Sequence, residues 1–411
     1  MIDTKKTGER IAILRKERGL TAEKFSEILN VSPQAVSKWE TGKNLPETIL
    51  LPDISKLLGV TIDSLLIPTA YHVKSHLGGH YIDGLPPLRW GQSQDCTWAG
   101  ALKLLLDAIG VNVTYSEIMG FSGVCYYFSM TSDWCPSAAM PQIALKPDIT
   151  IARAVGVEGG HFTPEDRDSR VKESISHGMP VMLIQPRVEM EWGVLCGYTG
   201  EGQFYGRSYF DYLKPDEKDI FTNNNYFLAD SYPGADPRLI FFLSGRTTPA
   251  PLDEALKKSL ETAKNLFATK PMHDGRYVFG LDAYDILING LCLDDTGFAA
   301  ITQYGSTGNC VILLTHLIDA RRAAHTFWAE KSEYLSARNV RKMRNVAKLF
   351  ADMVSVLGDV LPNDIINFAQ NGYPIDAWVQ EKREKAASAL TTCKQLEQQT
   401  LNIISDTLEN W

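Results

Sequence analysis

The sequence predicts a multi-domain protein with an all-α head, a central α+β domain and a C-terminal helical region. With 411 residues, 44% of them hydrophobic, the chain is long enough for two or three packed cores. Helical patterns fill the beginning and the last third of the chain, whereas strand-like runs and glycine turns dominate the stretch between them. We therefore expect a helical head at 1–67, a linker at 68–87, a central domain at 88–247 and a helical domain at 248–411.

Within the head, residues 20–45 predict two short helices joined by a tight turn. Thr21 and Ser32 are placed to cap them, because their hydroxyls can accept hydrogen bonds from the first free N–H groups of a helix. Val36 and Trp39 recur at helical spacing and should be buried. The segment is therefore expected to be a helix-turn-helix motif.

The other face of the second helix carries side chains that can contact DNA. Glutamine and serine hydrogen-bond to base edges, alanine can touch a thymine methyl, and lysine binds phosphate or guanine. A recognition helix is built in this way, so the sequence predicts a double-stranded DNA operator as partner. The candidate contact residues are Thr21, Ser32, Gln34, Ala35, Ser37, Lys38, Lys43 and Asn44.

Residues 4–67 resemble the lambda-repressor-like (Cro-type) helix-turn-helix family. The resemblance is carried by the order of four helices and their caps, by Ser-Lys-Trp-Glu-Thr-Gly at 37–42, and by the later apolar segment 57–66. One position departs from the family, which usually has a phosphate-contacting Gln where this chain has Ala22. The resemblance implies sequence-specific DNA binding, and Ala22 implies a weaker affinity. The alternative is a helix-turn-helix domain that is kept only for contact with another protein.

Composition and charge bound the remaining possibilities. Residues 1–67 carry 10 Lys/Arg and 9 Asp/Glu, whereas the rest of the chain carries 31 and 40. The acidic remainder should repel phosphate, so DNA contact is expected only in the head.

Seven cysteines are too sparse for a disulfide scaffold, and their odd number favours reduced thiols. Because the chain shows neither a leader nor a bilayer-length apolar run, we expect a cytoplasmic protein without membrane contact.

The expected linker contains His72, His76 and His80 at a spacing of four. On one helix this spacing could bind zinc, but a Gly-Gly pair interrupts any helix between the second and third histidines. We therefore expect no metal site here, and the sequence indicates no cofactor.

The central domain contains a cysteine at the start of an apolar helix, Cys96–Ile109. Asp95 can cap this helix. A helix N-terminus lowers a thiol pKa and offers N–H groups to a developing oxyanion, which Gln92 could also stabilise. Residues 90–102 resemble the nucleophile helix of papain-like cysteine enzymes, most closely the bacteriocin-leader peptidases and butirosin-type acyltransferases. This resemblance implies a papain-like α+β domain.

The papain-like pattern places a His at the start of a central strand and an Asn or Asp one strand later. The matching positions here hold Glu191 or Trp192, and Asp211. The family mechanism needs an imidazole to accept the thiol proton, and a Glu beside Cys96 would disfavour the thiolate. His161 from another loop is an alternative source of that imidazole. The resemblance thus implies a catalytically inactive scaffold, with an ordinary core cysteine and a working nucleophile as alternatives.

Aromatic and acidic residues gather in the central domain and favour a cationic small-molecule ligand, through ion pairing and cation–π contact. The loop-like stretch Phe128–Met140 could fold over the mouth of such a pocket. The candidate ligand-binding residues are Gln92, Asp95, Cys96, Trp98, Asp133, Trp134, Cys135, Glu191, Trp192 and Asp211.

Two function classes follow. The first is a DNA-binding transcriptional regulator with a catalytically inactive papain-like sensor domain, and the missing histidine favours it. The second is a papain-like cysteine acyltransferase or peptidase with Cys96 as nucleophile and a DNA-binding head. A repressor whose C-terminal part only oligomerises is a third. Because such heads bind weakly alone, we expect a homodimer, with the helices Val311–Ser336 and Val340–Leu357 as its interface.

Overall fold

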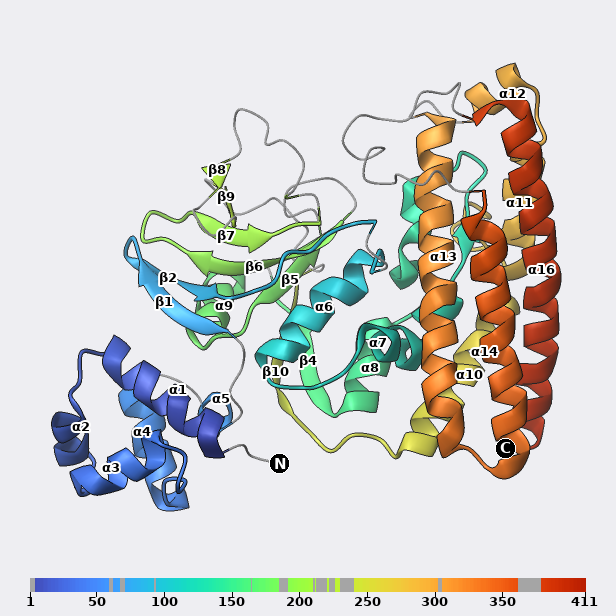
Figure 1. The fold of residues 1–411 in the computed structure, drawn as a ribbon. Coiled ribbons are helices and arrows are strands. Elements are labelled where there is room, and N and C mark those ends of the chain that lie inside the picture. Colours follow the sequence, from blue (N-terminus) through green and yellow to red (C-terminus); the bar gives the residue numbers. More distant parts are fainter. Residues whose placement is uncertain are drawn as a thin grey trace.

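The structure is a computed structural model with three visible parts: a small helical head, a twisted sheet with flanking helices, and a group of long helices (Figure 1). It describes residues 4–58, 62–66, 71–91, 94–163, 165–184, 191–209, 211, 220–221, 226–229, 240–301, 305–360 and 378–411.

The head is all-helical and has a core of its own. Its elements are α1 (Thr4–Glu17), α2 (Ala22–Ile28), α3 (Pro33–Glu40), η1 (Thr48–Leu50), α4 (Leu51–Leu58) and α5 (Ile62–Leu66). Apolar side chains of all five α-helices meet in this core, which contains Ile11, Phe25, Val36, Ile54 and Leu65, among others. Helices α1 and α3 pack closely because Gly8 has no side chain: a Cβ there would lie 2.0 Å from the Trp39 carbonyl oxygen.

Nine strands form one sheet in which every pair is antiparallel. They are β1 (His72–His76), β2 (Gly79–Asp83), β4 (Val157–His161), β5 (Val181–Ile184), β6 (Trp192–Tyr198), β7 (Phe204–Arg207), β8 (Ile220–Phe221), β9 (Phe227–Ala229) and β10 (Ile240–Arg246). The main path runs β4-β10-β5-β6-β7-β9-β8. The β1–β2 hairpin joins it where His80 and Tyr81 pair with Tyr198 and Gly197 of β6. The expectation of a linker at 68–87 is therefore wrong for 72–83, which belong to the sheet.

Four helices accompany the sheet: α6 (Thr97–Ala108), α7 (Tyr115–Ser122), α8 (Pro147–Val155) and α9 (Arg167–Ser176). Helix α6 contacts β5, β6 and β10, and nine of its twelve residues are buried, so it is the central helix of this part. Helix α7 in turn joins α6 to the C-terminal helices. This combination is a mixed α/β arrangement built around one almost wholly buried helix.

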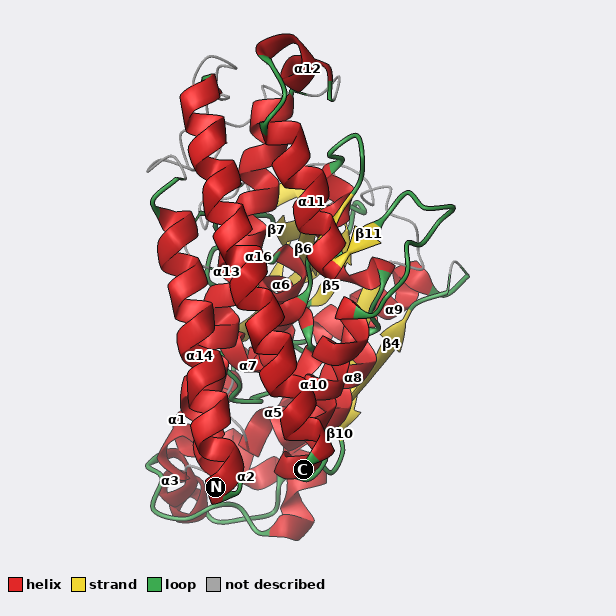
Figure 2. Cartoon of the chain, turned by 90° about the vertical axis from the view of Figure 1, so that its right-hand side faces the viewer, coloured by secondary structure: helices red, strands yellow, loops and turns green. Residues whose placement is uncertain are grey.

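The C-terminal third consists of long helices, which Figure 2 shows side by side. They are α10 (Leu252–Phe267), α11 (Gly280–Leu291), α12 (Asp295–Ala300), α13 (Ser306–Lys331), α14 (Ala337–Gly358) and α16 (Gln380–Glu409). Short elements complete the region: η2 (Val124–Tyr126), η3 (Pro136–Ala139), η4 (Pro141–Ile143), η6 (Ser332–Tyr334), and the pair β3 (Ser129–Met130) and β11 (Val278–Phe279).

Helices α13 and α14 pack against each other, and α14 packs against α16 of the same chain. Seventeen residues of α13 are buried, against α14 and also against α7, η2 and η3. The apolar faces that were expected to form a dimer interface are therefore used inside the chain, and that expectation is corrected.

One hydrophobic core runs through the sheet part and the helical part together, from Tyr71 to Ile404. The hydrophobic core is therefore continuous across the expected domain boundary at 247–248. This boundary falls between the end of β10 and the start of α10. Among the described residues, no helix is both long enough and apolar enough to cross a bilayer.

Candidate functional site

The first candidate site is the exposed face of α3 in the head. Ser32 caps the helix by accepting a hydrogen bond from the Ala35 N–H (3.2 Å), and Thr21 does the same for α2 from the Lys24 N–H (3.1 Å). Val36 and Trp39 are buried, at 0% and 5% exposure. The buried side chains and the N-cap thus hold α3 in one orientation, and this orientation turns its opposite face towards solvent.

That outer face is polar and open to solvent. Gln34, Ser37 and Lys38 are exposed, and so are Lys43 and Asn44 in the turn that follows the helix. Ala35 is half-buried between the two faces. The structure therefore brings the predicted recognition residues together on one accessible surface.

An ion pair between α1 and α3 holds α3 in place, and no local pattern in the sequence indicates this pair. The Arg15 guanidinium donates to both carboxylate oxygens of Glu40, at 2.6 and 3.0 Å, and both side chains are largely buried. Glu40 raises the pKa of Arg15 through this hydrogen bond. Bidentate geometry adds directional restraint to the attraction, so α3 is locked in rotation against α1.

The second candidate site surrounds Cys96 at the start of α6. Cys96 is itself the N-cap of the helix, and Asp95 instead accepts a hydrogen bond from the Gly91 N–H (2.5 Å). The expectation that Asp95 caps the helix is therefore wrong. The Cys96 N–H donates to the Tyr115 hydroxyl (2.9 Å) and to the Asp319 carboxylate (3.2 Å), so α7 and α13 both meet α6 at this point.

The surroundings of Cys96 disfavour the thiolate, which is the reactive form of the side chain. Burial raises the pKa of the Cys96 thiol to about 12, and the carboxylates of Asp319 and Asp95 raise it further. Burial also raises the pKa of Asp319, although the hydrogen bonds that it accepts from Tyr115 and from the Cys96 N–H act to lower it. The main-chain N–H that could stabilise an oxyanion already donates to a carboxylate and a phenol.

The structure does bring several of the predicted residues together here. The Trp192 N–H at the start of β6 donates to the Thr97 hydroxyl (3.2 Å), so the beginnings of β6 and α6 are adjacent. Glu191, the residue before, is buried. Burial raises the pKa of the Tyr209 phenol, and Cys96, Asp95, Asp319 and Glu191 around it add to the effect.

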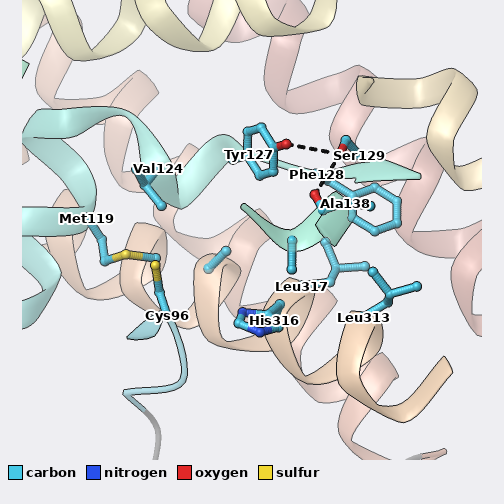
Figure 3. A pocket seen from close by; sticks show the side chains of 12 residues that line it. Cys96, Met119, Val124, Tyr127, Phe128, Ser129, Ala138, Leu313, His316 and Leu317 are labelled. Atoms are coloured by element: carbon cyan, nitrogen blue, oxygen red, sulfur yellow. Dashed lines mark hydrogen bonds between the residues drawn. The ribbon is translucent and has the colours of Figure 1, made fainter. Parts of the chain in front are cut away.

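A pocket opens beside Cys96, between α13 and residues 119–139 (Figure 3). Cys96 and Met119 lie at one end of it in this view, and Leu313 and Phe128 at the other. The pocket is lined by Cys96, Met119, Val124, Tyr127, Phe128, Ser129, Ala138, Ala139, Leu313, His316, Leu317 and Ala320.

Of the predicted ligand-binding residues that the structure describes, only Cys96 lines this pocket. Asp133 is exposed and faces Arg276 at 3.9 Å. Trp134 is buried in the helical part against Phe298, at 5.9 Å between ring centroids. Neither side chain lines the pocket, although Phe128, Ser129, Ala138 and Ala139 of the same stretch, 128–140, do.

The remaining candidates have structural partners of their own. The indole N–H of Trp98 donates to Asp148 (2.7 Å), inside the core. The Cys135 thiol contacts the Ser137 hydroxyl (3.0 Å), and Asp211 accepts a hydrogen bond from the Ser208 N–H (2.9 Å). Gln92 lies outside the described residues.

Sequence reasoning missed His316 and Asp319, which α13 brings to the Cys96 site. The two residues are three positions apart and therefore share one face of a helix. Their spacing within a correctly expected helix was the available signal. It was overlooked because histidine was sought only in the strands and loops of the central domain.

The comparisons with known proteins concern the head. Residues 11–65 match the family described as Helix-turn-helix. Over 58 residues the chain is 48% identical to the HTH-type transcriptional activator BcrR of Enterococcus faecalis. That match covers 14% of this chain and 28% of BcrR, so the chain spans well under half of that curated relative. The head is a helix-turn-helix domain.

Proposed function

We propose that the protein is a sequence-specific DNA-binding transcriptional regulator. The observation that carries this proposal is the capped α3 helix, which exposes Gln34, Ser37 and Lys38 above the buried Val36 and Trp39. The likeness of the head to a transcriptional activator supports it. In this proposal Gln34 and Ser37 select bases, whereas Lys38 and Lys43 bind phosphate.

Selection of duplex DNA by the full chain, followed by titration of the selected operator, tests this function. Gln34→Ala should relax the preference at one base pair by about 1–3 kcal/mol. Lys38→Ala should weaken binding to all sequences and reduce the salt dependence by about one phosphate contact. Lys348→Ala removes an equal charge from an exposed position on α14 and should change neither. A selected-site pattern that is identical for wild type and Gln34→Ala would contradict the assignment.

We further propose that residues 71–411 form a small-molecule sensor on a papain-like scaffold that has lost catalysis. The adjacent starts of α6 and β6 support the papain-like relation, and Glu191 in place of a histidine supports the loss of catalysis. The raised pKa of Cys96 and its engaged N–H support the loss of activity. A ligand would act by binding one arrangement of the chain more tightly than another, which shifts the population that binds DNA.

The regulator is proposed to act as a homodimer, because two half-sites one helical turn apart multiply the affinity of weakly binding heads. The interface is left unassigned, since α13 and α14 are used within the chain. Light scattering at micromolar concentration is expected to give twice the monomer mass of 45.8 kDa. A mass of one chain, free and on DNA, would contradict this.

One observation favours the enzyme as a second candidate. His316 lines the same pocket as Cys96, so an imidazole lies near the thiol although none occurs at the expected strand position. A cysteine acyltransferase or peptidase would need Cys96 as thiolate. Alkylation by iodoacetamide separates the candidates, with the exposed Cys292 as internal reference. Slow labelling of Cys96 relative to Cys292 supports the sensor, whereas fast labelling at pH 7 supports the enzyme.

A further inference from the structure

The acidic excess of residues 68–411 is not spread evenly, because the start of α14 is strongly cationic. This part of the chain carries 31 Lys/Arg and 40 Asp/Glu, yet the segment 337–348 carries five cations and no acid. The free N–H groups at a helix N-terminus give it a partial positive charge, which favours acids and disfavours cations. The sequence therefore gathers positive charge where helix formation opposes it.

Three of these cations are exposed along one side of α14: Arg338, Arg341 and Arg344. We call them the α14 basic patch. Residues three apart are neighbours on a helix surface, so the three guanidinium groups lie close together. Within the described chain, Arg338 and Arg341 form no ion pair. Arg344 pairs with Glu333 (3.1 Å), but both side chains are more than half exposed, and such a pair contributes little.

The two remaining cations of the segment have acidic neighbours. Lys342 pairs with Asp406 of α16 (2.5 Å). The hydrogen bond from Lys342, together with the charges of Lys342 and Arg338, lowers the pKa of Asp406. Lys348 lies further along α14 and is followed by Asp352 four residues later, the spacing at which a helix brings opposite charges together. The positive charge of α14 is therefore concentrated in its first two turns.

An exposed tyrosine adjoins the α14 basic patch. Tyr334 lies in η6, the short turn that leads into α14, and 65% of it is exposed. Arginine and tyrosine side chains are among the groups that hydrogen-bond to phosphate oxygens in protein–DNA complexes. This end of the helical part therefore presents the side chains that suit a nucleic-acid backbone.

The position of the patch decides which DNA it can contact. Figure 1 shows the head and the start of α14 at the same end of the molecule, on opposite sides of it. A compact chain of 411 residues measures roughly 55 Å across, which corresponds to about 16 base pairs of duplex. A straight duplex held by the head therefore meets the patch with base pairs that lie beyond the operator.

We propose that the α14 basic patch binds the phosphate backbone of the duplex DNA that flanks the operator. This inference rests on the proposed DNA-binding function and adds a second contact outside the head. It departs from the expectation that the acidic part of the chain only repels DNA. Because the contact is made to the backbone, it requires no particular flanking sequence.

Two duplexes test this contact on the full protein: the selected operator alone, and the same operator centred in about 60 base pairs of unrelated sequence. Wild type should bind the long duplex at least fivefold more tightly at low salt. Arg338→Ala with Arg341→Ala should abolish that gain and leave the affinity for the operator alone unchanged. Lys264→Ala with Lys270→Ala removes the same charge from exposed positions in and after α10 and should keep the gain.

The salt dependence of binding provides a second readout. For the long duplex, its slope should fall by about 2 in the double arginine variant, close to 0.9 per lost phosphate contact. An equal gain on the long duplex in both double variants would overturn the proposal. So would the absence of a gain in wild type, a result that leaves specific binding of the operator, and with it the proposed function, intact. Loss of sequence preference on the operator alone contradicts the proposed function instead, whereas a length-dependent gain that only the arginine variant loses supports the patch.

Discussion

Replacing His316 by leucine should remove a large part of the protein's sensitivity to mild acid. The imidazole titrates at 6.5 in the unfolded chain, whereas burial alone lowers its pKa to about 4 in the folded protein. A depressed histidine pKa means that the unfolded state binds a proton more readily than the folded state. Stability is therefore lost as pH falls below 6.5, and the loss levels off below about 4.

The size of this effect follows from the two pKa values. At pH 7 the imidazole is mostly neutral in both states and contributes little. At pH 5 it is almost fully protonated in the unfolded chain and mostly neutral in the fold, which costs about 2 kcal/mol at most.

Urea unfolding at pH 7 and pH 5 measures the loss. Wild type should lose about 2 kcal/mol more between these pH values than His316→Leu does. Leu313→Ala is the matched control: it lines the same pocket and should lower stability equally at both pH values. An identical pH response of wild type and His316→Leu would show that burial does not lower the pKa of this imidazole in the fold.

Three further substitutions test the packing that positions the two sites. Glu397→Gln leaves the fully buried Arg321 without its charge partner and should lower the free energy of unfolding by about 3–5 kcal/mol, whereas Glu381→Gln, in an exposed pair, should have little effect by urea unfolding. Gly120→Ala places a Cβ 2.3 Å from the Phe327 ring and should cost about 1–3 kcal/mol. Gly358→Ala, which meets no atom, should not lower the melting temperature. Ser32→Ala removes a cap worth about 1 kcal/mol and should speed hydrogen exchange of the α3 amides roughly fivefold, while Ser32→Asp should not.

Local sequence rules predicted the head because all of its determinants are local. Caps, turn and apolar spacing lie within one or two helical turns of the residues they control, so Thr21, Ser32, Val36 and Trp39 occupy the expected places. The strand β5 (Val181–Ile184) belongs to the stretch where the sequence predicts strands, because a short apolar run bounded by turns can be recognised without a distant partner.

The predictions that failed depend on long-range pairing. For residues 72–83 the sequence predicts a linker, because their glycines and polar residues show no apolar alternation. In the structure these residues form a hairpin, and its pairing with β6 makes it part of the sheet. The pocket likewise joins residues more than two hundred positions apart, such as Cys96 and His316. Acidic and aromatic residues close in sequence, such as Asp133 and Trp134, point to different surroundings in the fold.

The contacts of the head suggest how a ligand at the pocket could reach the DNA-binding surface. Arg10 of α1 donates to the Tyr71 carbonyl (3.4 Å), directly before the hairpin that pairs with β6. The other end of β6 bonds to Thr97, next to the N-cap residue Cys96 that lines the pocket. The head, the hairpin, β6 and the start of α6 thus form one continuous series of contacts. Coupling along it requires two arrangements of the chain with different ligand affinity, and a bound ligand that leaves operator affinity unchanged would show that the two regions are not coupled.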